Sequence, residues 1–378
     1  MKMRVGIDAR PLSRQLSGIG YYTLHLVKEL SKAGVETVLF SPSPLTVDLS
    51  GLDRCSIVCK SFKRLATRQI WSEFFLPFLL KKFDLDVFWG PAHRLPFWLP
   101  HNVAGVVTIH DVIWKRYPET MRKSTRLLET AFMPGSVQRA DLVIADSRST
   151  AADLLEFFGL ADSKIRIVPL APRLSETGGR QSGPLLPGRK YFLFVGTREP
   201  RKNLSSLIEA FGTLSEAARR EFSLIIAGGD GWGNVSPAEK VAELGLQDCI
   251  TVKQFLSEAE LVEYYKQAYC LVMPSLYEGY GLPILEAQSF GVPVITSNVS
   301  SMPEVAGEGA VLVDPHSVES ILVGLEKLIV DEALREDLSL KARENAGKYS
   351  WAKTAELTAS SFEEAISLKN GNAHDINY

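Results

Sequence analysis

The stretch 270–296 constrains the fold of this chain more than any other part of the sequence. Its apolar run 270–274 ends at a proline and predicts a short buried strand. A loop with two glycines follows, and the segment 283–290 then predicts a short helix, because proline suits the first helical turn and a glycine ends it. The run 292–296 predicts the next strand. The pattern is that of one unit of an α/β sheet.

Two glutamates lie eight residues apart in this unit, Glu278 in the loop and Glu286 inside the helix. A helix start presents unpaired N–H groups and a partial positive charge, which suit a phosphate. Carboxylates are good acceptors for sugar hydroxyls. Two solvated glutamates flanking a capped helix are the alternative interpretation, which the glycines and the buried strands disfavour.

A second motif follows another apolar run, residues 191–195, which predicts a strand. Arg198 and Lys202 lie in the loop after this strand, at the position where α/β sheets bind their ligands. Asn203 predicts the N-cap of a helix over residues 204–214. An ordinary basic turn is the alternative for this motif alone, but its combination with the glutamate pair favours a site for an anionic ligand.

The length of 378 residues predicts two domains, and 46% hydrophobic residues are enough for two cores. Residues 175–189 are rich in Gly, Pro and Ser and predict the interdomain linker. We therefore expect a first domain over residues 1–174 and a second over residues 190–350. Residues 351–378 are expected to form a C-terminal helix and a tail that is disordered past Lys369.

Charge is distributed unevenly along the chain. The net charge of −2 gives no reason to expect bulk binding of nucleic acid. Residues 1–172 carry 23 Lys and Arg against 16 Asp and Glu, whereas the remainder carries 19 against 28. A basic first half and an acidic second half predict different partners for the two domains.

Cysteine spacing and hydropathy bear on the compartment. Cys55, Cys59, Cys249 and Cys270 show no zinc-binding spacing and are expected to be free thiols in a reducing environment. We find neither a signal peptide nor an apolar run of about 18 residues. The sequence therefore predicts a cytoplasmic protein.

The segment 60–82 combines six basic residues with aromatic ones. Such a helix can lie in a membrane interface, or it can pack on a core and expose a basic face. A second basic patch (Lys115, Arg116, Arg122, Lys123 and Arg126) favours a membrane surface slightly. The pair Asp84 and Asp86 has the spacing of a metal–nucleotide motif, but it introduces a strand, so no metal site is expected.

Polar residues follow other predicted strands. His110 and Asp111 end the strand 103–109, and we expect Asp111 to orient the imidazole of His110. Ser147 follows the strand 142–145 in the same way. Gly18 and Gly20 form a glycine turn before a helix predicted over residues 21–33, although a plain helix-start turn fits them as well.

Taken together, the glycine turn, His110 with Asp111, Arg198 with Lys202, and Glu278 with Glu286 resemble the nucleotide-sugar glycosyltransferases of family 4. The resemblance spans nearly the whole chain. It implies the GT-B fold, with two Rossmann-like α/β domains facing across a cleft and a C-terminal helix that crosses back to the first domain. It also implies retention of anomeric configuration.

The resemblance further implies roles for individual residues. Arg198 and Lys202 would neutralise the donor pyrophosphate, Glu278 would hold the transferred sugar, and His110 would contact that sugar as the fourth catalytic residue. Glu286 would bind the ribose. The other donor-binding residues would be Gly18, Gln254, Phe255, Gly279, Tyr280, Gly281 and Leu282. The acceptor side would include Gly20, Tyr21, Asp111 and Ser147. No cofactor and no metal would be required.

Two segments near the N-terminus narrow the choice of nucleotide-sugar donor. The segments 7–12 and 18–23 resemble bacterial O-antigen mannosyltransferases that use GDP-mannose, with a UDP-hexose as the rival donor. The acceptor would be a growing lipid-linked glycan at the inner membrane face, with which the protein could associate peripherally. A sugar-nucleotide epimerase and a non-catalytic sugar-nucleotide-binding protein are the alternatives from other functional classes.

Overall fold

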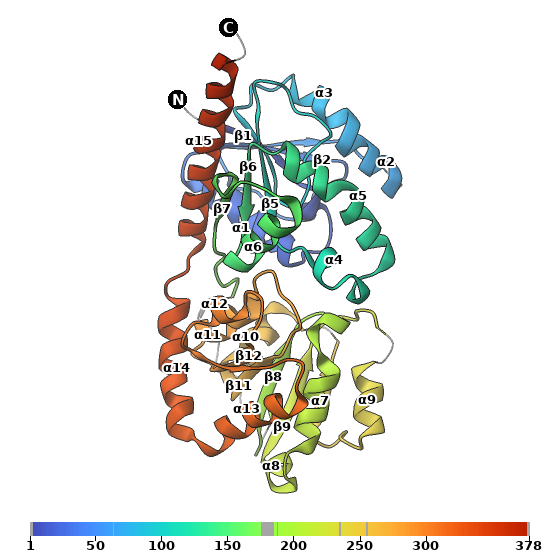
Figure 1. The fold of residues 1–378 in the computed structure, drawn as a ribbon, viewed down its shortest axis with the longest axis vertical. Helices are drawn as coiled ribbons and strands as arrows, with labels where there is room; N and C mark the ends of the chain where they lie inside the picture. Colours follow the sequence, from blue (N-terminus) through green and yellow to red (C-terminus); the bar gives the residue numbers. More distant parts are fainter. Residues whose placement is uncertain are drawn as a thin grey trace. The chain divides into compact units, whose positions relative to one another are not determined.

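The computed structural model describes residues 3–62, 64–174, 185–186, 188–233, 236–254 and 256–375. Phe255 and most of the predicted linker 175–189 lie outside these residues. The chain divides into two compact units (Figure 1). Met1–Lys115, Lys123–Leu170 and Ser350–Tyr378 form the first unit, and Arg116–Arg122 and Ala171–Tyr349 form the second. Each unit is a parallel sheet flanked by helices, so the predicted pair of Rossmann-like α/β domains is confirmed.

The first unit is built on seven parallel strands among the described residues, in the order β3-β2-β1-β4-β5-β6-β7. The central strands are continuous apolar runs because helices cover both faces of such a sheet. The strands are β1 (Arg4–Asp8), β2 (Glu36–Ser41), β3 (Cys55–Cys59), β4 (Val87–Gly90), β5 (Ala104–Ile109), β6 (Leu142–Ala145) and β7 (Ile165–Ile167).

The helices of the first unit connect these strands. They are η1 (Arg10–Ser13), α1 (Gly18–Lys32), α2 (Leu65–Ile70), the π-helical turn η2 (Trp71–Phe75), α3 (Leu76–Leu80), α4 (Ile113–Arg116), α5 (Lys123–Arg139), α6 (Arg148–Phe158), η4 (Asp162–Lys164) and α15 (Trp351–Asp375). The sequence places the start of α1 three residues too late, because it counts the glycine turn as a loop.

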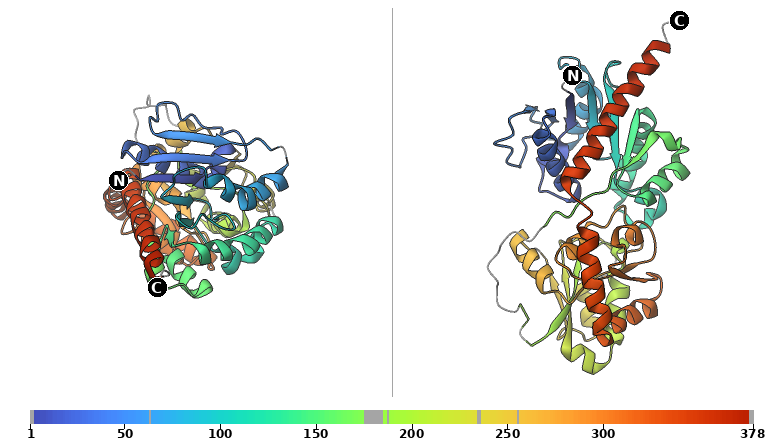
Figure 2. Two further views of the ribbon diagram at one scale, coloured as in Figure 1. Left: turned by 90° about the horizontal axis from the view of Figure 1, so that it is seen from above. Right: turned by 90° about the vertical axis from the view of Figure 1, so that its left-hand side faces the viewer.

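The C-terminal helix α15 packs on the first unit, as the GT-B fold requires (Figure 2). The Trp351 ring stacks on His25 with centroids 4.6 Å apart, and Phe362 contacts Trp89. The helix α15 extends to Asp375, and the expected disorder past Lys369 stays a prediction. Lys369 Nζ lies 3.5 Å from a carboxylate oxygen of Asp141.

The second unit has six parallel strands among the described residues, in the order β10-β9-β8-β11-β12-β13. They are β8 (Lys190–Val195), β9 (Phe222–Ala227), β10 (Ile250–Lys253), β11 (Cys270–Met273), β12 (Val294–Ser297) and β13 (Ala310–Val313). Its helices are η3 (Pro118–Thr120), η5 (Pro200–Lys202), α7 (Leu204–Thr213), α8 (Glu216–Glu221), α9 (Pro237–Glu243), α10 (Glu258–Gln267), α11 (Leu282–Ser289), α12 (Met302–Ala306), α13 (Val318–Val330) and α14 (Glu332–Ala346).

Strand order positions the candidate site of the second unit. From β8 the chain adds β9 and β10 on one side, and it then returns to add β11, β12 and β13 on the other. The reversal falls between β8 and β11, and ligands of open α/β sheets bind beside the carboxyl ends of strands at such a point. In the first unit the reversal falls between β1 and β4.

The four cysteines are free thiols, as predicted.

Candidate functional site

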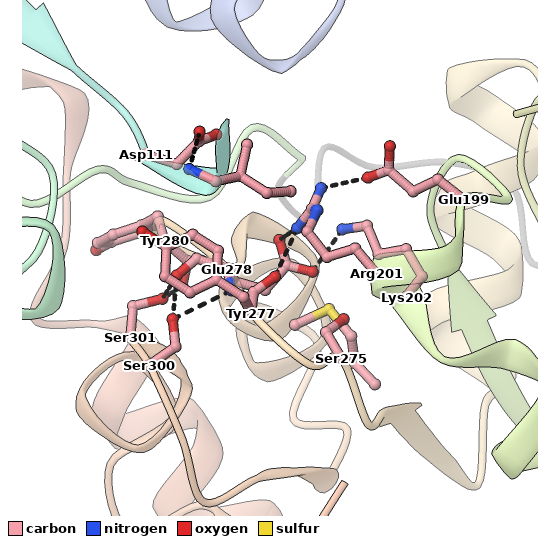
Figure 3. Close-up of polar contacts among 12 residues, drawn as sticks. Asp111, Glu199, Arg201, Lys202, Ser275, Tyr277, Glu278, Tyr280, Ser300 and Ser301 are labelled. Atoms are coloured by element: carbon pink, nitrogen blue, oxygen red, sulfur yellow. Dashed lines mark hydrogen bonds and ion pairs between the residues drawn. The ribbon is translucent and has the colours of Figure 1, made fainter. Parts of the chain in front are cut away.

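The two sequence motifs of the second unit meet at this reversal point. Because β8 and β11 are paired neighbours, the loops that follow them emerge at the same edge of the sheet. Lys202 Nζ, after β8, donates to Glu278 Oε1, after β11, at 2.6 Å. Arg201 NH1 donates to Glu278 Oε2 at 2.5 Å. One buried carboxylate therefore holds two cations (Figure 3).

The electrostatics of this cluster favour its charged form. Burial alone would raise the pKa of Glu278, but Arg201 and Lys202 outweigh it and lower that pKa to about 2. Burial lowers the pKa of Lys202, and the positive charge of Arg201 lowers it further, against the opposing effect of Glu278. The two neighbouring cations repel each other, and the carboxylates of Glu278 and Glu199 compensate their charge.

The turn that carries Arg201 and Lys202 is fixed to the loop after β11. The Leu276 N–H donates to the Arg201 carbonyl at 2.8 Å. Asn203 occupies the N-cap position of α7, but in the left-handed region, with φ 58° and no capping hydrogen bond. Its carboxamide donates instead to the carbonyls of Pro274 and Pro315, at 3.1 and 2.7 Å. The predicted N-cap position is therefore confirmed, but the Asn203 side chain makes tertiary hydrogen bonds in place of a capping bond.

Hydroxyl groups after β12 hold the glycine loop (residues 274–281). Ser301 Oγ donates to the carbonyls of Glu278 and Tyr280, at 2.9 and 2.8 Å. Ser300 also hydrogen-bonds to the backbone of Glu278, and Ser297 Oγ donates to the Ser275 carbonyl at 2.7 Å. The sequence motifs did not single out Ser300 and Ser301. The run of serines after a predicted strand was the available signal.

The glycine loop ends at Gly281, the N-cap of α11, with φ +99°, a region that L side chains rarely adopt. A Cβ there would also approach Ile284 and Met273 closely, at 3.2 and 3.3 Å. Leu282 is the first helical residue, so α11 starts one residue before the predicted position. The roles of Gly279, Tyr280, Gly281 and Leu282 toward a donor stay predictions.

Glu286 lies in α11 with 4% of its surface exposed. Tyr265 Oη donates to its Oε2 at 2.9 Å, and Arg173 Nε lies 3.2 Å from its Oε1. Burial raises the pKa of Glu286, and Arg173 and Tyr265 oppose that effect. Sequence reasoning missed both partners, because neither is near a motif in the chain. Together they fix the orientation of the carboxylate.

Arg198 has a different partner from the one its predicted role requires. It forms an ion pair with Asp230, which follows β9, and its N–H donates to the Gly229 carbonyl at 3.2 Å. Among the described residues, the basic side chains that contact Glu278 are those of Arg201 and Lys202. The structure therefore does not place Arg198 in the Glu278 cluster with Lys202, and its role toward the pyrophosphate stays a prediction.

Gln254 follows β10, an edge strand separated from β11 by β9 and β8, and its side chain is exposed. The structure shows no contact that would test its predicted role toward the nucleobase. Phe255, the other residue assigned to the nucleobase, is outside the described residues.

In the first unit, His110 lies at the carboxyl end of β5 and is buried. Its Nδ1 is 2.5 Å from Asp146 Oδ2, and its Nε2 is 2.8 Å from the Pro91 carbonyl. A carbonyl oxygen only accepts hydrogen bonds, and so does an ionised carboxylate. The geometry therefore suits the imidazolium form of His110, which can donate from both ring nitrogens. Burial alone would lower the pKa of His110, but Asp146 outweighs it and raises that pKa.

Asp111 does not orient this imidazole, contrary to the prediction. Its Oδ1 accepts from the N–H of Ile113 at 3.2 Å and so serves its own loop. Asp146, which follows the neighbouring strand β6, holds His110 instead. The first-unit partners that sequence reasoning missed are His93, whose Nε2 accepts from the His110 N–H at 3.1 Å, and Tyr22, whose ring meets the His110 ring edge-on.

The remaining predicted residues of the first unit have local structural contacts. Gly18 is the first residue of α1. A Cβ at Gly20 would lie 2.9 Å from the Leu16 side chain and 3.2 Å from the Pro11 carbonyl, so close packing requires this glycine. Tyr21 follows in α1. The Ser147 hydroxyl accepts from the Thr150 N–H at 3.0 Å and caps α6. Their donor or acceptor roles stay predictions.

Asp84 and Asp86 precede β4, at the amino ends of the strands of the first sheet, whereas His110 lies at their carboxyl ends. Asp86 Oδ2 accepts from the Arg4 N–H at 2.7 Å, where β1 begins. Across the described parts of the chain, no cluster of three or more His, Cys, Asp or Glu side chains could bind a metal. A search of the same residues finds no helix with the length and apolarity needed to span a bilayer.

The fold and the site define a class of protein that comparison with known sequences identifies. Residues 16–171 match the model of glycosyltransferase family 4, and residues 179–345 match that of the glycosyl transferases group 1. The chain belongs to the family 4 glycosyltransferases of GT-B type.

Among its relatives is the O-antigen chain mannosyltransferase B of Escherichia coli, which is 28% identical over 96% of this chain and all of that protein. The serotype-specific mannosyltransferase WbdA of Escherichia coli is 29% identical over 61% of this chain, but over only 29% of its own length.

Solved structures share the fold. Sucrose-phosphate synthase from Thermosynechococcus elongatus superposes with a TM-score of 0.75 at 20% identity, covering 97% of this chain and all of that one. WaaG, a glycosyltransferase involved in lipopolysaccharide biosynthesis, gives 0.73 at 18% identity, covering 94% of this chain and 98% of that one. The predicted fold class, family and enzyme class are confirmed.

Proposed function

We propose that the protein transfers mannose from GDP-mannose, with retention of configuration, to a growing lipid-linked glycan. The observation that carries the proposal is the junction of Lys202 and Glu278 at the reversal point of the second sheet. It combines a buried cation, suited to a phosphate, with a buried carboxylate, suited to sugar hydroxyls. Similarity to O-antigen mannosyltransferases over nearly the whole chain supports the choice of sugar.

The proposed reaction breaks the bond between the anomeric carbon and the phosphate oxygen and forms a bond to an acceptor hydroxyl. The hydroxyl proton passes to the leaving phosphate on the same face of the sugar. Lys202, beside Glu278, would stabilise the charge that grows on this phosphate. No protein nucleophile is required, which distinguishes the route from the two-carboxylate displacement of retaining glycosidases.

Glu278 would bind hydroxyls of the transferred sugar while keeping its two cations, because a carboxylate offers about four lone-pair positions. Glu286, held by Tyr265 and Arg173, would accept from the ribose hydroxyls. His110 would contact the sugar from the first unit. Both ring nitrogens and the backbone N–H of His110 already have partners, so this contact would require the exchange of one of them.

A donor panel tests the proposal. Purified protein is incubated with radiolabelled GDP-mannose, UDP-glucose or UDP-galactose and a lipid extract from a bacterium that makes a mannose-containing O-antigen. Transfer of label from GDP-mannose into the lipid fraction is expected. Transfer from a UDP-hexose alone would replace the donor. Release of free sugar, an epimerised nucleotide sugar, or binding without turnover would contradict the proposed transferase reaction.

A lipid-linked acceptor requires contact with a membrane, and the α2–η2–α3 segment offers a surface for it. Trp71, Glu73 and Leu76 are buried, so this side faces the interior of the first unit. The opposite side exposes Ile70, Phe74, Phe75 and Phe78, and Phe97 extends it by stacking on Phe74. Phe75 and Phe78 are each 60% exposed. Exposed aromatic rings near Lys81 and Lys82 suit the interface of an anionic bilayer.

The segment packs on a core, as one sequence interpretation expects, and it also exposes aromatic rings, whose contact with a membrane stays a proposal. The second basic patch is divided between the two units, with Lys115, Lys123 and Arg126 in the first. Arg116–Arg122 groups with the second unit, where the Arg122 guanidinium lies over the Trp232 ring, 4.9 Å from its centroid.

Vesicle sedimentation tests the membrane contact. We expect binding to vesicles that contain phosphatidylglycerol, and about tenfold weaker binding by a Phe75→Ser, Phe78→Ser double variant. The control removes exposed apolar residues from α13 through Val323→Ser and Val330→Ser, with no loss expected. Equal binding by both double variants would remove this surface as the membrane contact.

A further inference from the structure

The sequence assigns Arg198 as the cation that assists Lys202, but the structure places a different arginine beside it. Resting on the proposed nucleotide-sugar transfer, we propose that Arg201, not Arg198, is the second cation that binds the diphosphate of the donor. Three sets of contacts support diphosphate binding by Arg201.

The first set concerns where Arg201 points. NH1 of Arg201 donates to Glu278 Oε2 at 2.5 Å and to the Tyr277 carbonyl at 2.8 Å. Its NH2 hydrogen-bonds to the Glu199 carboxylate. The guanidinium therefore lies against the glycine loop, on the same carboxylate as the Lys202 ammonium (Figure 3). An anion that binds Lys202 beside Glu278 meets Arg201 as well.

The second set concerns rigidity. A main-chain hydrogen bond from Leu276 to the Arg201 carbonyl fixes the 3-10 turn η5 to the loop after β11. The Asn203 amide, directly after the turn, donates to the carbonyls of Pro274 and Pro315 and holds it further. A group that is held in place before the ligand arrives loses little entropy on binding it, and it stabilises developing charge without reorganisation.

The third set concerns Arg198. Its guanidinium pairs with Asp230 and its backbone bridges the same residue. These contacts connect the loop after β8 with the loop after β9, which is on the other side of β8 from β11. Arg198 therefore holds two loops together, and its charge is compensated by a carboxylate that is itself 75% exposed.

The resting state of the cluster also suits an anion. Arg201 and Lys202 are adjacent in the chain and share one carboxylate, Glu278, while Glu199 takes the other side of Arg201. The repulsion between the two cations lowers the pKa of Lys202, after the larger effect of burial. Glu278 is the shared counterion of both cations, and a diphosphate placed against them would contact the two cations together while Glu278 keeps its contacts.

The test compares affinities for nucleotides that differ by one phosphate. Calorimetry measures GDP and GMP, and UDP and UMP, on the wild type and on Arg201→Ala, Arg201→Lys and Arg198→Ala, with Arg220→Ala as an exposed control. In wild type the diphosphate of the preferred nucleoside is expected to bind at least about tenfold more tightly than its monophosphate. Arg201→Ala should reduce that ratio about tenfold and leave monophosphate affinity within about threefold.

Arg201→Lys should keep part of the ratio, because an ammonium retains the charge but cannot contact Glu278, Tyr277 and Glu199 in the fork geometry of a guanidinium. Arg198→Ala should change the ratio less than about threefold. An unchanged ratio in Arg201→Ala, or a collapse of the ratio in Arg198→Ala, overturns the inference. A merely structural role predicts equal losses for diphosphate and monophosphate.

Circular dichroism shows whether each variant is folded. If Arg201→Ala does not fold, Arg201→Lys and Arg198→Ala decide, since the inference requires a reduced ratio in the first and an intact ratio in the second. Wild-type protein that binds none of the four nucleotides would contradict the proposed function itself, an outcome distinct from binding that is independent of Arg201.

Discussion

Lys202 Nζ and Glu278 Oε1 lie 2.6 Å apart, although 76 residues separate them in the chain. The contact exists because β8 and β11 are neighbours at the point where the strand order of the second sheet reverses. It joins a basic motif to a glutamate motif and so creates a site that neither loop forms alone.

Replacement of Lys202 tests the phosphate role most directly. We expect Lys202→Ala to lower kcat/KM at least about 100-fold, on the order of 3 kcal/mol, because it removes a buried cation from the departing phosphate. Steady-state kinetics measure the loss. The protein should stay folded, since Arg201 still pairs with Glu278. Lys190→Ala, at an exposed pair with Glu221, is the control. Near-normal turnover in Lys202→Ala would remove Lys202 from the phosphate site.

The two glutamates should differ in the kinetic parameter that they control. Glu278→Gln removes charge next to the reacting sugar, so we expect kcat to fall about 100-fold with little change in donor KM. Glu286→Gln acts on the ribose, which changes little during transfer, so donor KM should rise about tenfold at nearly constant kcat. Initial rates at varied donor concentration separate the two. The reverse pattern would show that the sugar does not lie in the glycine loop.

Tyr265 should act through Glu286. Tyr265→Phe removes the hydroxyl that donates to Glu286 Oε2, at a cost of about 1 kcal/mol, so donor KM should rise about three- to tenfold. Tyr191→Phe removes a comparable bond, from Tyr191 Oη to the Tyr264 carbonyl at 2.8 Å, and should leave donor KM unchanged. Equal donor KM values in both variants would mean that Glu286 needs no support from Tyr265.

The His110–Asp146 pair should make stability depend on pH. The pKa of His110 is raised in the folded state. The pair therefore contributes its full share of the free energy of unfolding below the ordinary histidine pKa of 6.5. The contribution is lost as the pH rises through the folded pKa. Urea unfolding between about pH 5.5 and 9 should show this decline. Asp146→Asn should flatten the profile by lowering stability at acidic pH, whereas Asp111→Asn should keep most of it. A wild-type profile in Asp146→Asn would exclude the pair as its source.

Metal removal tests whether side-chain cations suffice for the diphosphate. We expect the transfer rate to be unchanged after incubation with excess EDTA and desalting, because Arg201 and Lys202 provide the positive charge that a divalent ion supplies in other enzymes. A rate that disappears with EDTA and returns with magnesium or manganese would show that a metal takes part.

The sequence alone determined the class of fold and the positions of the main motifs. Apolar runs such as those of β9 and β11 predict buried strands from local sequence alone. The residue types in the loops after such strands limit the kinds of ligand that a site there can bind. Lys202, Glu278 and Glu286 were found in this way. The chemistry of a loop that follows a buried strand can be inferred without knowing its neighbours.

Tertiary structure alone decided which side chains act together. Arg201, which no motif singled out, shares Glu278 with Lys202, and Asp146 holds His110 where the sequence favoured Asp111. In both cases the partner is decided by which strands are adjacent. It also depends on whether a candidate side chain already forms hydrogen bonds or ion pairs with a nearer loop. Spacing along the chain does not encode that information, because neighbouring strands of a parallel sheet come from distant segments joined by long crossovers.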